Sequence, residues 1–528
     1  WFADAAFLGD SLTAGFCVNE YNIDVGGALV CGYEGISPNT VVNRATVTSP
    51  DRGEEVPLDV LAAAQPAKLY ILIGTNALVQ PGNDDSFLAY YGKMLDDLRT
   101  ALPNTVFYVQ SVLPATQEKA ADSLPGLAPD RLAVINLCNS THCRVRMISD
   151  PQAVDENGNP VAAGFRELNT ADFLSRDEIQ LNNAQISEYL HDKIVLVTGG
   201  GGSIGSELCR QIMRSQPRRL LIFDIYENCA YELLMELQQK YGRDIPVTVL
   251  IGSIRDKKRL DEVFETYHPT VVFHAAAHKH VPLMEVSPAE AVKNNVLGTK
   301  NLLVSASEHD VERFVQLSTD KAVNPTSVMG CTKRICEMLI QTFAGNTDMK
   351  CVAVRFGNVL GSHGSVIPLF EEQIKRGGPV TITHPDIVRY FMTITEAAQL
   401  VLQAGGLAKG GSIYVLDMGE PVKIMDLAKQ LIRFYGYEPG VNMEIKIVGL
   451  RPGEKLYEEL MMDEEQDKMR RTVHNKIFVA PPRNIDLGEF YQQLQELAVA
   501  AEHNDDSVVE QLAKMVPTFT PTRENLKL

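Results

Sequence analysis

Short apolar runs alternate with amphipathic segments through residues 193–345. The run Lys193–Thr198 (KIVLVT) is typical of a strand buried on both faces. The sequence GGGGSIGSELCRQIMRS then passes from glycines into a helical period, and RRLLIFD predicts a second strand that ends at Asp224. The alternation continues through the extended runs PVTVLIGS, TVVFHAAA and RFVQLST. Strands and helices that alternate in this way predict a doubly wound α/β domain with a parallel sheet and right-handed crossovers.

A polar stretch at about residues 155–192 separates this series from an earlier α/β series. We therefore expect an N-terminal domain over residues 1–164, a linker over 165–192 and the doubly wound domain over 193–482. Residues 483–528 are predicted to form a helical tail that is loosely attached.

Length and charge limit the classes of function. At 528 residues the chain is long enough for more than one hydrophobic core. The formal charge of -18 argues against nucleic-acid binding, which depends on lysine and arginine at the phosphates. No run approaches the roughly 18 apolar residues that span a bilayer, so we expect no membrane segment. The chain opens at Trp1 rather than at a methionine, and we expect it to be part of a longer protein.

The nine cysteines are scattered, and Cys138 and Cys143 lack a second pair at zinc-ligand spacing. We therefore expect reduced, mostly buried thiols in a cytoplasmic protein, and no metal.

Glycines at positions 199, 202 and 205 form a GxxGxxG turn between the first strand and its helix. Glycine allows the tight turn and the close approach of a pyrophosphate to the helix N-terminus. Asp224, at the end of the next strand, stands where an acid would bond ribose hydroxyls. This arrangement predicts a dinucleotide site and favours NAD over NADP, because a 2′-phosphate would meet the negative charge. The alternative is a glycine-rich turn beside a solvated aspartate.

The segment LSTDKAVNPTSVMGCTKR places Thr319, Asp320 and Lys321 just past the carboxyl end of a strand, where open α/β sheets bind ligands. An adjacent acid and base there favour a chemical role, although an ordinary surface ion pair is the alternative. Met329 and Lys333 follow, four residues apart and therefore on one helix face.

The second series resembles UDP-N-acetylglucosamine 4,6-dehydratases of the polysaccharide-biosynthesis type, which are extended short-chain dehydrogenases with a Rossmann domain and a small C-terminal substrate-binding part. The resemblance runs from about Phe165 to the 480s and is carried, in order, by TGGGGSIGSELCRQI, FHAAAHKHVPLME, NNVLGT, LSTDKAVNPTSVMGCTKR, RFGNVLGSHGSVIPLF, RYFMTI and RPGEKLYEEL. Met329 occupies the tyrosine position of the YxxxK element. In this position the chain resembles the large, membrane-anchored branch of the family. Enzymes of that branch generally retain the configuration at carbon 5.

The resemblance implies oxidation at sugar carbon 4, loss of the carbon-5 proton and the 6-hydroxyl, and reduction at carbon 6. Lys321, neutral when desolvated beside the cationic nicotinamide, would be the carbon-5 base, Asp320 the acid at the 6-hydroxyl, and Thr319 a donor to the 4-oxygen. Met329 accepts no proton, so the base for the 4-hydroxyl stays open between Asp320 and a water relay. A UDP-sugar epimerase on the same fold is the alternative.

The binding residues follow from the same resemblance. The expected partners are UDP-N-acetylglucosamine or a related UDP-hexosamine, NAD with NADP as the alternative, and a second copy of the chain by analogy. The cofactor residues would be Gly199, Gly202, Ser203, Ile204, Gly205, Asp224, Ser253, Ile254, Ala275, Ala276 and Lys333. The substrate residues would be Lys279, His280, Asn358, Arg389, Arg451 and Glu454. Packing or surface placement is the alternative for Lys279 and His280, and a solvated helix position for Lys333.

The N-terminal third resembles the SGNH hydrolases. Ser11 lies in a GDSL element, and Gly35 and Asn76 match two further blocks that would complete an oxyanion hole. The DxxH block that would supply the general base is missing, and His142 lies in another context. We therefore expect a truncated α/β domain that is either a glycan or lipid esterase or, preferably, a carbohydrate-binding or assembly module.

Overall fold

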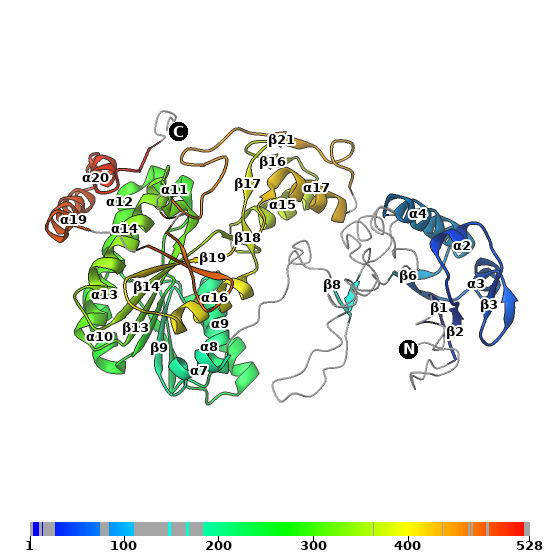
Figure 1. Cartoon of the computed structure of the whole chain (residues 1–528), viewed down its shortest axis with the longest axis horizontal. Coiled ribbons are helices and arrows are strands. Elements are labelled where there is room, and N and C mark those ends of the chain that lie inside the picture. The colour runs from blue at the N-terminus through cyan, green and yellow to red at the C-terminus, as the bar shows by residue number, and fades with distance from the viewer. Residues whose placement is uncertain are drawn as a thin grey trace. The chain divides into compact units, whose positions relative to one another are not determined.

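The structure is a computed structural model, and two compact units account for it (Figure 1). The first unit comprises residues 1–173, 374–379 and 428–445, and the second comprises 174–373, 380–427 and 446–528. The residues that the structure describes are 4–9, 13, 27–73, 84–109, 146–148, 165–167, 183–362, 364–435, 437–462, 465, 468–481 and 485–521.

The first unit contains a four-stranded parallel sheet in the order β2-β1-β5-β6. Its strands are β1 (Ala5–Gly9), β2 (Leu29–Gly32), β5 (Lys68–Leu72) and β6 (Val106–Val109), and its helices are α2 (Pro38–Val42), α3 (Pro57–Ala64) and α4 (Asp84–Ala101). The helix α4 buries Tyr91, Met94, Leu95 and Leu98, spaced as one helical face, in the core of this unit. The N-terminal α/β fold expected from the sequence is confirmed.

Two further pairs of short strands are described in this unit. The hairpin of β3 (Val47–Ser49) and β4 (Gly53–Glu55) is antiparallel. The strands β7 (Arg146–Ile148) and β8 (Phe165–Glu167) also pair antiparallel.

The second unit is built on a nine-stranded sheet in the order β11-β10-β9-β12-β13-β14-β19-β23-β22. The last two strands are antiparallel and the others are parallel. The bounds are β9 (Ile194–Thr198), β10 (Arg219–Asp224), β11 (Val247–Ile251), β12 (Val271–His274), β13 (Arg313–Thr319), β14 (Lys350–Phe356), β19 (Ser412–Leu416), β22 (Arg470–Arg471) and β23 (Ile477–Ala480). This order confirms the doubly wound sheet. The strand order reverses between β9 and β12, which is where such sheets bind ligands.

Helices cover both faces of this sheet (Figure 1). One core contains side chains of α8 (Ser203–Arg214), α9 (Glu227–Tyr241) and α16 (Ile394–Gly406). The other contains side chains of α10 (Lys257–Tyr267), α13 (Gly298–Glu308) and α14 (Val328–Ala344). Between β12 and α13 lie α11 (Val281–Val286), α12 (Pro288–Ala291) and a π-helical turn, η2 (Val292–Leu297). The apolar strands are therefore buried on both sides, as their sequence predicts.

A smaller set of elements follows β14 and forms the region right of the sheet in Figure 1. Here β15 (Asn358–Val359) pairs with β18 (Phe391–Met392), and β17 (Val388–Arg389) pairs with β20 (Val422–Lys423). The other elements of this region are α15 (Val366–Lys375), β16 (Val380–Ile382), α17 (Ile424–Phe434) and β21 (Ile445–Ile447).

The predicted linker contains a helix of the second unit, α7 (Asn183–Leu190). Tyr189 is 6% exposed, and its hydroxyl donates to the Leu402 carbonyl at 2.7 Å. Gln403 Nε2 donates to Gln185 Oε1 at 2.6 Å. The linker therefore ends before 183, because the apolar face of this short helix packs on α16.

The C-terminal helices are packed into the second unit rather than loosely attached. These helices are α19 (Leu487–Glu502) and α20 (Val508–Met515), and their buried side chains join the core that contains α14. Thr520 N donates to Pro325 O at 3.0 Å, and Cys331 Sγ donates to Leu512 O at 3.6 Å. The earlier expectation is wrong because Phe490, Leu494 and Leu497 form an apolar stripe that a free tail would expose.

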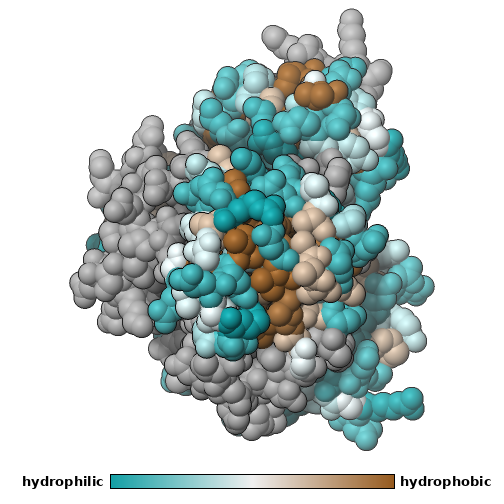
Figure 2. Space-filling view, turned by 90° about the vertical axis from the view of Figure 1, so that its right-hand side faces the viewer, coloured by the Kyte–Doolittle hydropathy of each residue, from teal (hydrophilic) through white to brown (hydrophobic). Residues whose placement is uncertain are grey.

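None of the described helices combines the length and apolar character needed to cross a bilayer. Within the described ranges, no group of three or more His, Cys, Asp or Glu side chains is arranged to hold a metal ion. On the face shown in Figure 2 the described surface is largely hydrophilic, and its apolar side chains gather in a central strip and in a smaller patch near the top of the view.

Candidate active site

The glycine turn between β9 and α8 depends on residues without a side chain. Gly199 has a φ of +66°, and a β-carbon there would lie 2.6 Å from the Ala276 backbone nitrogen. A β-carbon on Gly205 would collide with the Gly199 carbonyl oxygen. Gly202 caps α8, whose first residue is Ser203. The turn therefore leaves the helix N-terminus open to an anionic group, as a pyrophosphate requires.

Asp224 is held beside this turn by two backbone amides. Its Oδ2 accepts a hydrogen bond from Gly201 N at 2.8 Å, and its Oδ1 accepts one from Tyr226 N at 2.9 Å. The carboxylate is thereby fixed at the carboxyl end of β10. This geometry fits the ribose of a dinucleotide, because each oxygen has a further lone pair for a hydroxyl donor.

The remaining predicted cofactor residues differ in what they offer. Ala275 lines the cavity described below, and Ala276 contributes its backbone beside Gly199. Ser253 Oγ accepts a hydrogen bond from Arg255 N at 3.2 Å. Ile254 is 3% exposed and belongs to the hydrophobic core. Its side chain is therefore committed to packing, and only its backbone is left to meet a cofactor.

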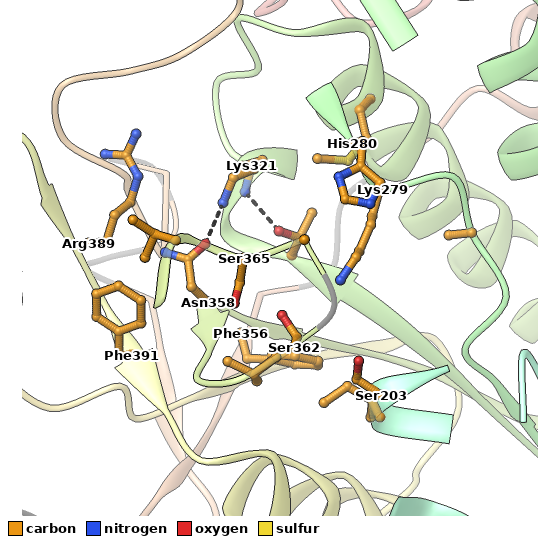
Figure 3. A pocket seen from close by; sticks show the side chains of 18 of the residues that line it. Ser203, Lys279, His280, Lys321, Phe356, Asn358, Ser362, Ser365, Arg389 and Phe391 are labelled. Atoms are coloured by element: carbon orange, nitrogen blue, oxygen red, sulfur yellow. Dashed lines mark hydrogen bonds between the residues drawn. The ribbon is translucent and has the colours of Figure 1, made fainter. Parts of the chain in front are cut away.

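A single cavity of about 630 Å³ joins the glycine turn to the loops after β12, β13 and β14. Figure 3 shows Lys321 and Asn358 pointing toward each other, with Lys279 and His280 on one side and Arg389 on the other. The predicted residues that line it are Gly199, Gly202, Ser203, Ile204, Gly205, Ala275, Lys279, His280, Thr319, Lys321, Met329, Lys333, Asn358, Arg389, Arg451 and Glu454. The predicted residues outside its lining are Asp224, Ser253, Ile254, Ala276 and Asp320.

Lys321 is the centre of the polar part of this cavity. It lies in a 3-10 turn, η3 (Asp320–Ala322), directly after β13. Its Nζ donates to Asp320 Oδ1 at 3.0 Å and to Asn358 Oδ1 at 3.2 Å. Glu458 Oε1 lies 3.9 Å from the same nitrogen. The lysine is therefore placed by groups from three separate segments of the chain.

The carboxylates around Lys321 decide its charge. Burial lowers the pKa of this amine, but Asp320 and Glu458 outweigh burial and raise the pKa above its usual value. The ammonium form of Lys321 is therefore favoured in the protein alone. The expectation of a neutral lysine concerns the protein with the cationic nicotinamide beside it and stays a prediction, and the sequence did not show the second carboxylate.

Asp320 is fully buried under Lys321. Its Oδ1 accepts hydrogen bonds from Thr319 Oγ1 (2.8 Å), Lys321 N (2.9 Å) and Lys321 Nζ. Among the described residues, its Oδ2 has no hydrogen-bond partner. A β-carbon on Gly357, which lines the cavity, would lie 3.3 Å from this Oδ2. The unpartnered oxygen therefore lies beside Gly357 on the side that also faces Tyr390 and Met418.

Met329 and Lys333 follow on α14, and both side chains line the cavity. Met329 is 4% exposed and Lys333 is 7% exposed. Burial lowers the pKa of Lys333. No described residue accepts a hydrogen bond from the Lys333 amine, which leaves its donors available to a ligand in the cavity.

Lys279 and His280 lie in the loop between β12 and α11, on the side of the cavity opposite Arg389 (Figure 3). Both side chains line the cavity while remaining exposed, so they are not packing residues. Desolvation lowers the pKa of each, and Lys279 contributes to the lower pKa of His280. The His280 ring lies against Gly364, where a β-carbon would be 2.6 Å from Cε1.

Arg389 on β17 fastens the segment 451–458 to the cavity wall. Its guanidinium donates to the carbonyls of Lys455 (2.8 Å) and Leu456 (3.2 Å). Glu454 Oε1 lies 3.5 Å from Nη2 of the same arginine. Arg451 is exposed and lines the cavity. Of the two arginines, Arg451 therefore has the guanidinium that is freer to meet a ligand.

Two polar residues of the site were missed in the sequence. Ser365, just before α15, lines the cavity, and no described residue pairs with its buried Oγ. Glu458 is 8% exposed and lies close to Lys321 and Arg389. A serine before an apolar helix is a capping signal, and Glu458 stands four residues after Glu454 in RPGEKLYEEL. Neither signal indicates a catalytic cluster, because the partners lie far away in the sequence.

The hydrolase-like residues are only partly described. Gly35 lies in a turn after β2 with a φ of +72°. Ser11, Asn76, Cys138, His142 and Cys143 lie outside the described residues, and so does most of the expected linker.

Together, the strand order, the glycine turn and the cavity at the switch point define an extended short-chain dehydrogenase fold. The family model described as "Polysaccharide biosynthesis protein" matches residues 195–482. The chain therefore belongs to the polysaccharide biosynthesis protein family. The family model described as "GDSL-like Lipase/Acylhydrolase family" matches residues 7–148 and agrees with the N-terminal resemblance.

Individual proteins show the same relationship. The capsular polysaccharide biosynthesis protein CapD of Staphylococcus aureus is 50% identical over 68% of this chain and 60% of its own length. A UDP-glucose 4-epimerase of Rickettsia canadensis is 35% identical over 57% of this chain and 82% of its own length. The X-ray structure of Pen from Bacillus thuringiensis is 35% identical, with a TM-score of 0.52, over 56% of this chain and 90% of that one. The chain thus spans 60% of the length of CapD.

Proposed function

We propose that the chain is an NAD-dependent UDP-N-acetylhexosamine 4,6-dehydratase acting on UDP-N-acetylglucosamine. The product would be a UDP-4-keto-6-deoxy-N-acetylhexosamine for a surface polysaccharide or glycan. The observation that supports this best is the Lys321–Asp320 pair, which lies at the wall of a cavity shared with a dinucleotide-type turn. Dehydration needs both a base at carbon 5 and an acid at the 6-hydroxyl, whereas exchange of configuration at carbon 4 needs neither.

The residues around the glycine turn fit NAD. Gly199, Gly202 and Gly205 would receive the pyrophosphate, Asp224 the adenosine ribose, and Lys333 the nicotinamide ribose. When bound, NAD supplies the acceptance and the return of hydride. The fixed carboxylate of Asp224 favours NAD over NADP, since a 2′-phosphate would be repelled by it.

Lys321 and Asp320 would divide the proton chemistry. Lys321 takes the proton from carbon 5 once it is neutral, because only the free amine has a lone pair. Asp320 would supply a proton to the leaving 6-hydroxyl, and its Oδ2, which no described residue pairs with, is the oxygen left to carry that proton. Thr319, whose hydroxyl donates to Asp320 Oδ1 in the protein alone, would turn this hydroxyl to the 4-oxygen when substrate binds. Met329 has no proton to exchange, so the 4-hydroxyl loses its proton to Asp320 or through a water molecule.

The substrate would lie across the rest of the cavity. Arg451 would bind the diphosphate, because a guanidinium offers paired, charge-assisted donors. Asn358 and Ser365 would add polar contacts beside it, and Ser365 lies where α15 directs its N-terminus. Lys279 and His280 would contact the sugar from the opposite wall. Arg389 would act mainly by holding the segment that carries Arg451 and Glu454.

The test is incubation of the full chain with UDP-N-acetylglucosamine and catalytic NAD, followed by mass spectrometry and proton NMR of the nucleotide sugar. Loss of one water with a new 6-methyl signal supports the dehydratase. An unchanged mass with changed stereochemistry at carbon 4 contradicts it. NAD binding is measured separately, so that loss of cofactor is not mistaken for lack of chemistry.

A UDP-sugar 4-epimerase is the second candidate, because an epimerase of that name is 35% identical over 82% of its length. A 4-epimerase on this fold has to remove and return one hydroxyl proton at carbon 4. Met329, at the helix position that faces the cavity, has no group for that transfer. The same incubation separates the two candidates through the mass of the product.

For the N-terminal unit we propose a carbohydrate-binding or assembly module rather than an esterase. The support is the GDSL-type match together with the lack of a DxxH block in the sequence. A fluorophosphonate probe tests the proposal. Labelling of Ser11 would establish an active serine and overturn the non-catalytic assignment.

A further inference from the structure

Glu458 is a buried carboxylate that the proposed chemistry has not yet used. It belongs to the segment 451–460, which is fixed to the domain at several points. Thr326 Oγ1 donates to Gly453 O at 3.0 Å, Lys455 Nζ donates to Val323 O at 3.0 Å, and Arg355 Nη1 donates to Leu460 O at 3.1 Å. The side chain of Glu458 is 3% exposed. Its position is therefore set by the fold rather than by solvent.

The charged groups that face Glu458 come from three elements. Lys321 Nζ lies 3.9 Å and Arg389 Nη2 lies 3.8 Å from Oε1. Asp320 is the nearby negative charge, and Lys455 is a further positive charge on the same segment. Lys455 is already paired with Glu459 at 2.8 Å. Two buried carboxylates, Asp320 and Glu458, thus share one ammonium, that of Lys321.

The two carboxylates differ in how well they are satisfied. Asp320 Oδ1 accepts three hydrogen bonds, one of them from Lys321 Nζ. The cations Lys321 and Arg389 lie 3.9 and 3.8 Å from Glu458 Oε1, farther than Lys321 lies from Asp320, and no described residue pairs with the buried Glu458 Oε2. Burial raises the pKa of Glu458, Lys321 and Arg389 oppose the rise, and Asp320 adds to it. Proton uptake by Glu458 is favoured, because a buried carboxylate with more distant cations and an unpaired oxygen is costly to keep as an anion.

We propose that Glu458 is a positioning residue that takes the proton of Lys321 and so releases the lysine as a neutral base. In this step one N–H bond of the ammonium breaks and an O–H bond forms on Glu458, so that charge and atoms balance without a further reactant. Lys321 takes the carbon-5 proton and gives it back to carbon 5 when carbon 6 is reduced, and the proton held on Glu458 then returns to the neutral lysine. This inference rests on the proposed dehydratase function for its consequence, but the coupling of the two side chains is measurable without substrate.

The first test measures the titration of Lys321 directly. The full chain is acetylated with trace acetic anhydride across the alkaline range, and the extent at Lys321 is followed by mass spectrometry against the exposed Lys258. The variants are E458Q, E458D and the control E459Q. Glu459 is the neighbouring acid, has a side chain 43% exposed and pairs with Lys455.

The E458Q variant removes one negative charge from beside the ammonium. We expect the Lys321 titration to move to lower pH by on the order of one pH unit. E458D keeps the charge, but the shorter side chain places the carboxylate farther from Lys321. It should therefore shift the Lys321 titration to lower pH by a smaller amount. E459Q should titrate as the wild type does. If E458Q and E458D both leave the titration unchanged, or if E459Q shifts it equally, the proposal is overturned.

The second test uses turnover of UDP-N-acetylglucosamine with NAD. E458Q should lower kcat near neutral pH, where a protonated Lys321 has lost its internal proton acceptor, with little change in KM, and the rate should recover as the pH rises through the lowered Lys321 titration. A side chain that only supports the fold would lower the rate without moving the profile, which would overturn the proposal. If Lys321 titrates as predicted but neither wild type nor variants convert the substrate, the dehydratase assignment fails while the coupling between Glu458 and Lys321 stands.

Discussion

The dinucleotide turn and the Lys321 cluster lie on the same cavity but are built in different ways. The turn is made of consecutive backbone residues. Its geometry is set by three glycines and by two hydrogen bonds that backbone amides donate to the Asp224 carboxylate. The Lys321 cluster is assembled from side chains at 320, 321, 358 and 458. A site built from contiguous backbone tolerates changes elsewhere in the chain, whereas an assembled site depends on every element that contributes a side chain. Substitutions in the two regions should therefore differ in their effects on NAD binding and on turnover.

The largest effect is expected for Lys321→Met. Loss of the base should lower kcat by about 10²–10⁴-fold, which is the usual contribution of general base catalysis. NAD binding, measured by fluorescence titration, should stay as in the wild type, because the glycine turn is a separate structure. If K321M loses NAD binding as well, the two regions are not independent.

Glu337→Gln should destabilise the Lys321 cluster by weakening buried ion pairs of the domain that carries it. Glu337 is fully buried, accepts from Ser318 Oγ at 2.7 Å, and pairs with Arg334 (2.7 Å) and Arg355 (2.9 Å). Burial raises the pKa of Glu337, but Arg355 and Arg334 outweigh burial and hold this pKa at about 2. Removing the charge leaves two buried arginines under-compensated and should lower the free energy of unfolding by about 3–5 kcal/mol. Urea denaturation near neutral pH measures this, and a loss below about 1 kcal/mol would contradict a supporting role.

Gly205→Val tests the turn. A β-carbon there meets the Gly199 carbonyl, so the turn must open, and we expect NAD affinity to fall by about a hundredfold or more, near 3 kcal/mol. Gly345→Ala is the matched control. Gly345 has a φ of −78°, and the nearest atom to an added β-carbon is 3.8 Å away. Equal losses of affinity in both variants would show that the turn is not the cofactor site.

The smallest effect is expected for Asp224→Asn. The amide keeps an acceptor for Gly201 N but loses the negative charge, so the preference for NAD over NADP should fall by about tenfold, or 1.4 kcal/mol. Isothermal titration with each cofactor measures the ratio. An unchanged preference would mean that the charge at the end of β10 does not select the cofactor.

The difference between the regions also explains what the sequence could predict. Gly199, Gly202, Gly205 and Asp224 were readable because their spacing reflects one local strand–turn–helix geometry. Thr319, Asp320 and Lys321 were readable as a group because they are adjacent at a strand end. The parallel, doubly wound sheet followed from the alternation of apolar and amphipathic segments, since a parallel sheet buries its strands on both faces.

What the sequence did not indicate depends on contacts between distant segments. Glu458 reaches Lys321 only because Arg389 and Lys455 fold its segment back over the cavity. The same contact puts a second carboxylate beside Lys321 and, together with Asp320, raises the pKa of its amine against the effect of burial. The helices α7 and α20 were assigned to a linker and a tail because their partners, α16 and α14, lie far away along the chain. Amphipathicity shows that a helix has a buried face, but it does not show what covers that face.

The measurement that tests the central claim most directly follows the hydrogen on carbon 4 of the sugar. UDP-N-acetylglucosamine carrying deuterium at that carbon is incubated with the full chain and NAD, and the product is examined by NMR. The account predicts that the label appears in the 6-methyl group of a product that has lost one water. Label that returns to carbon 4, in a product of unchanged mass, would contradict the dehydratase and support an epimerase.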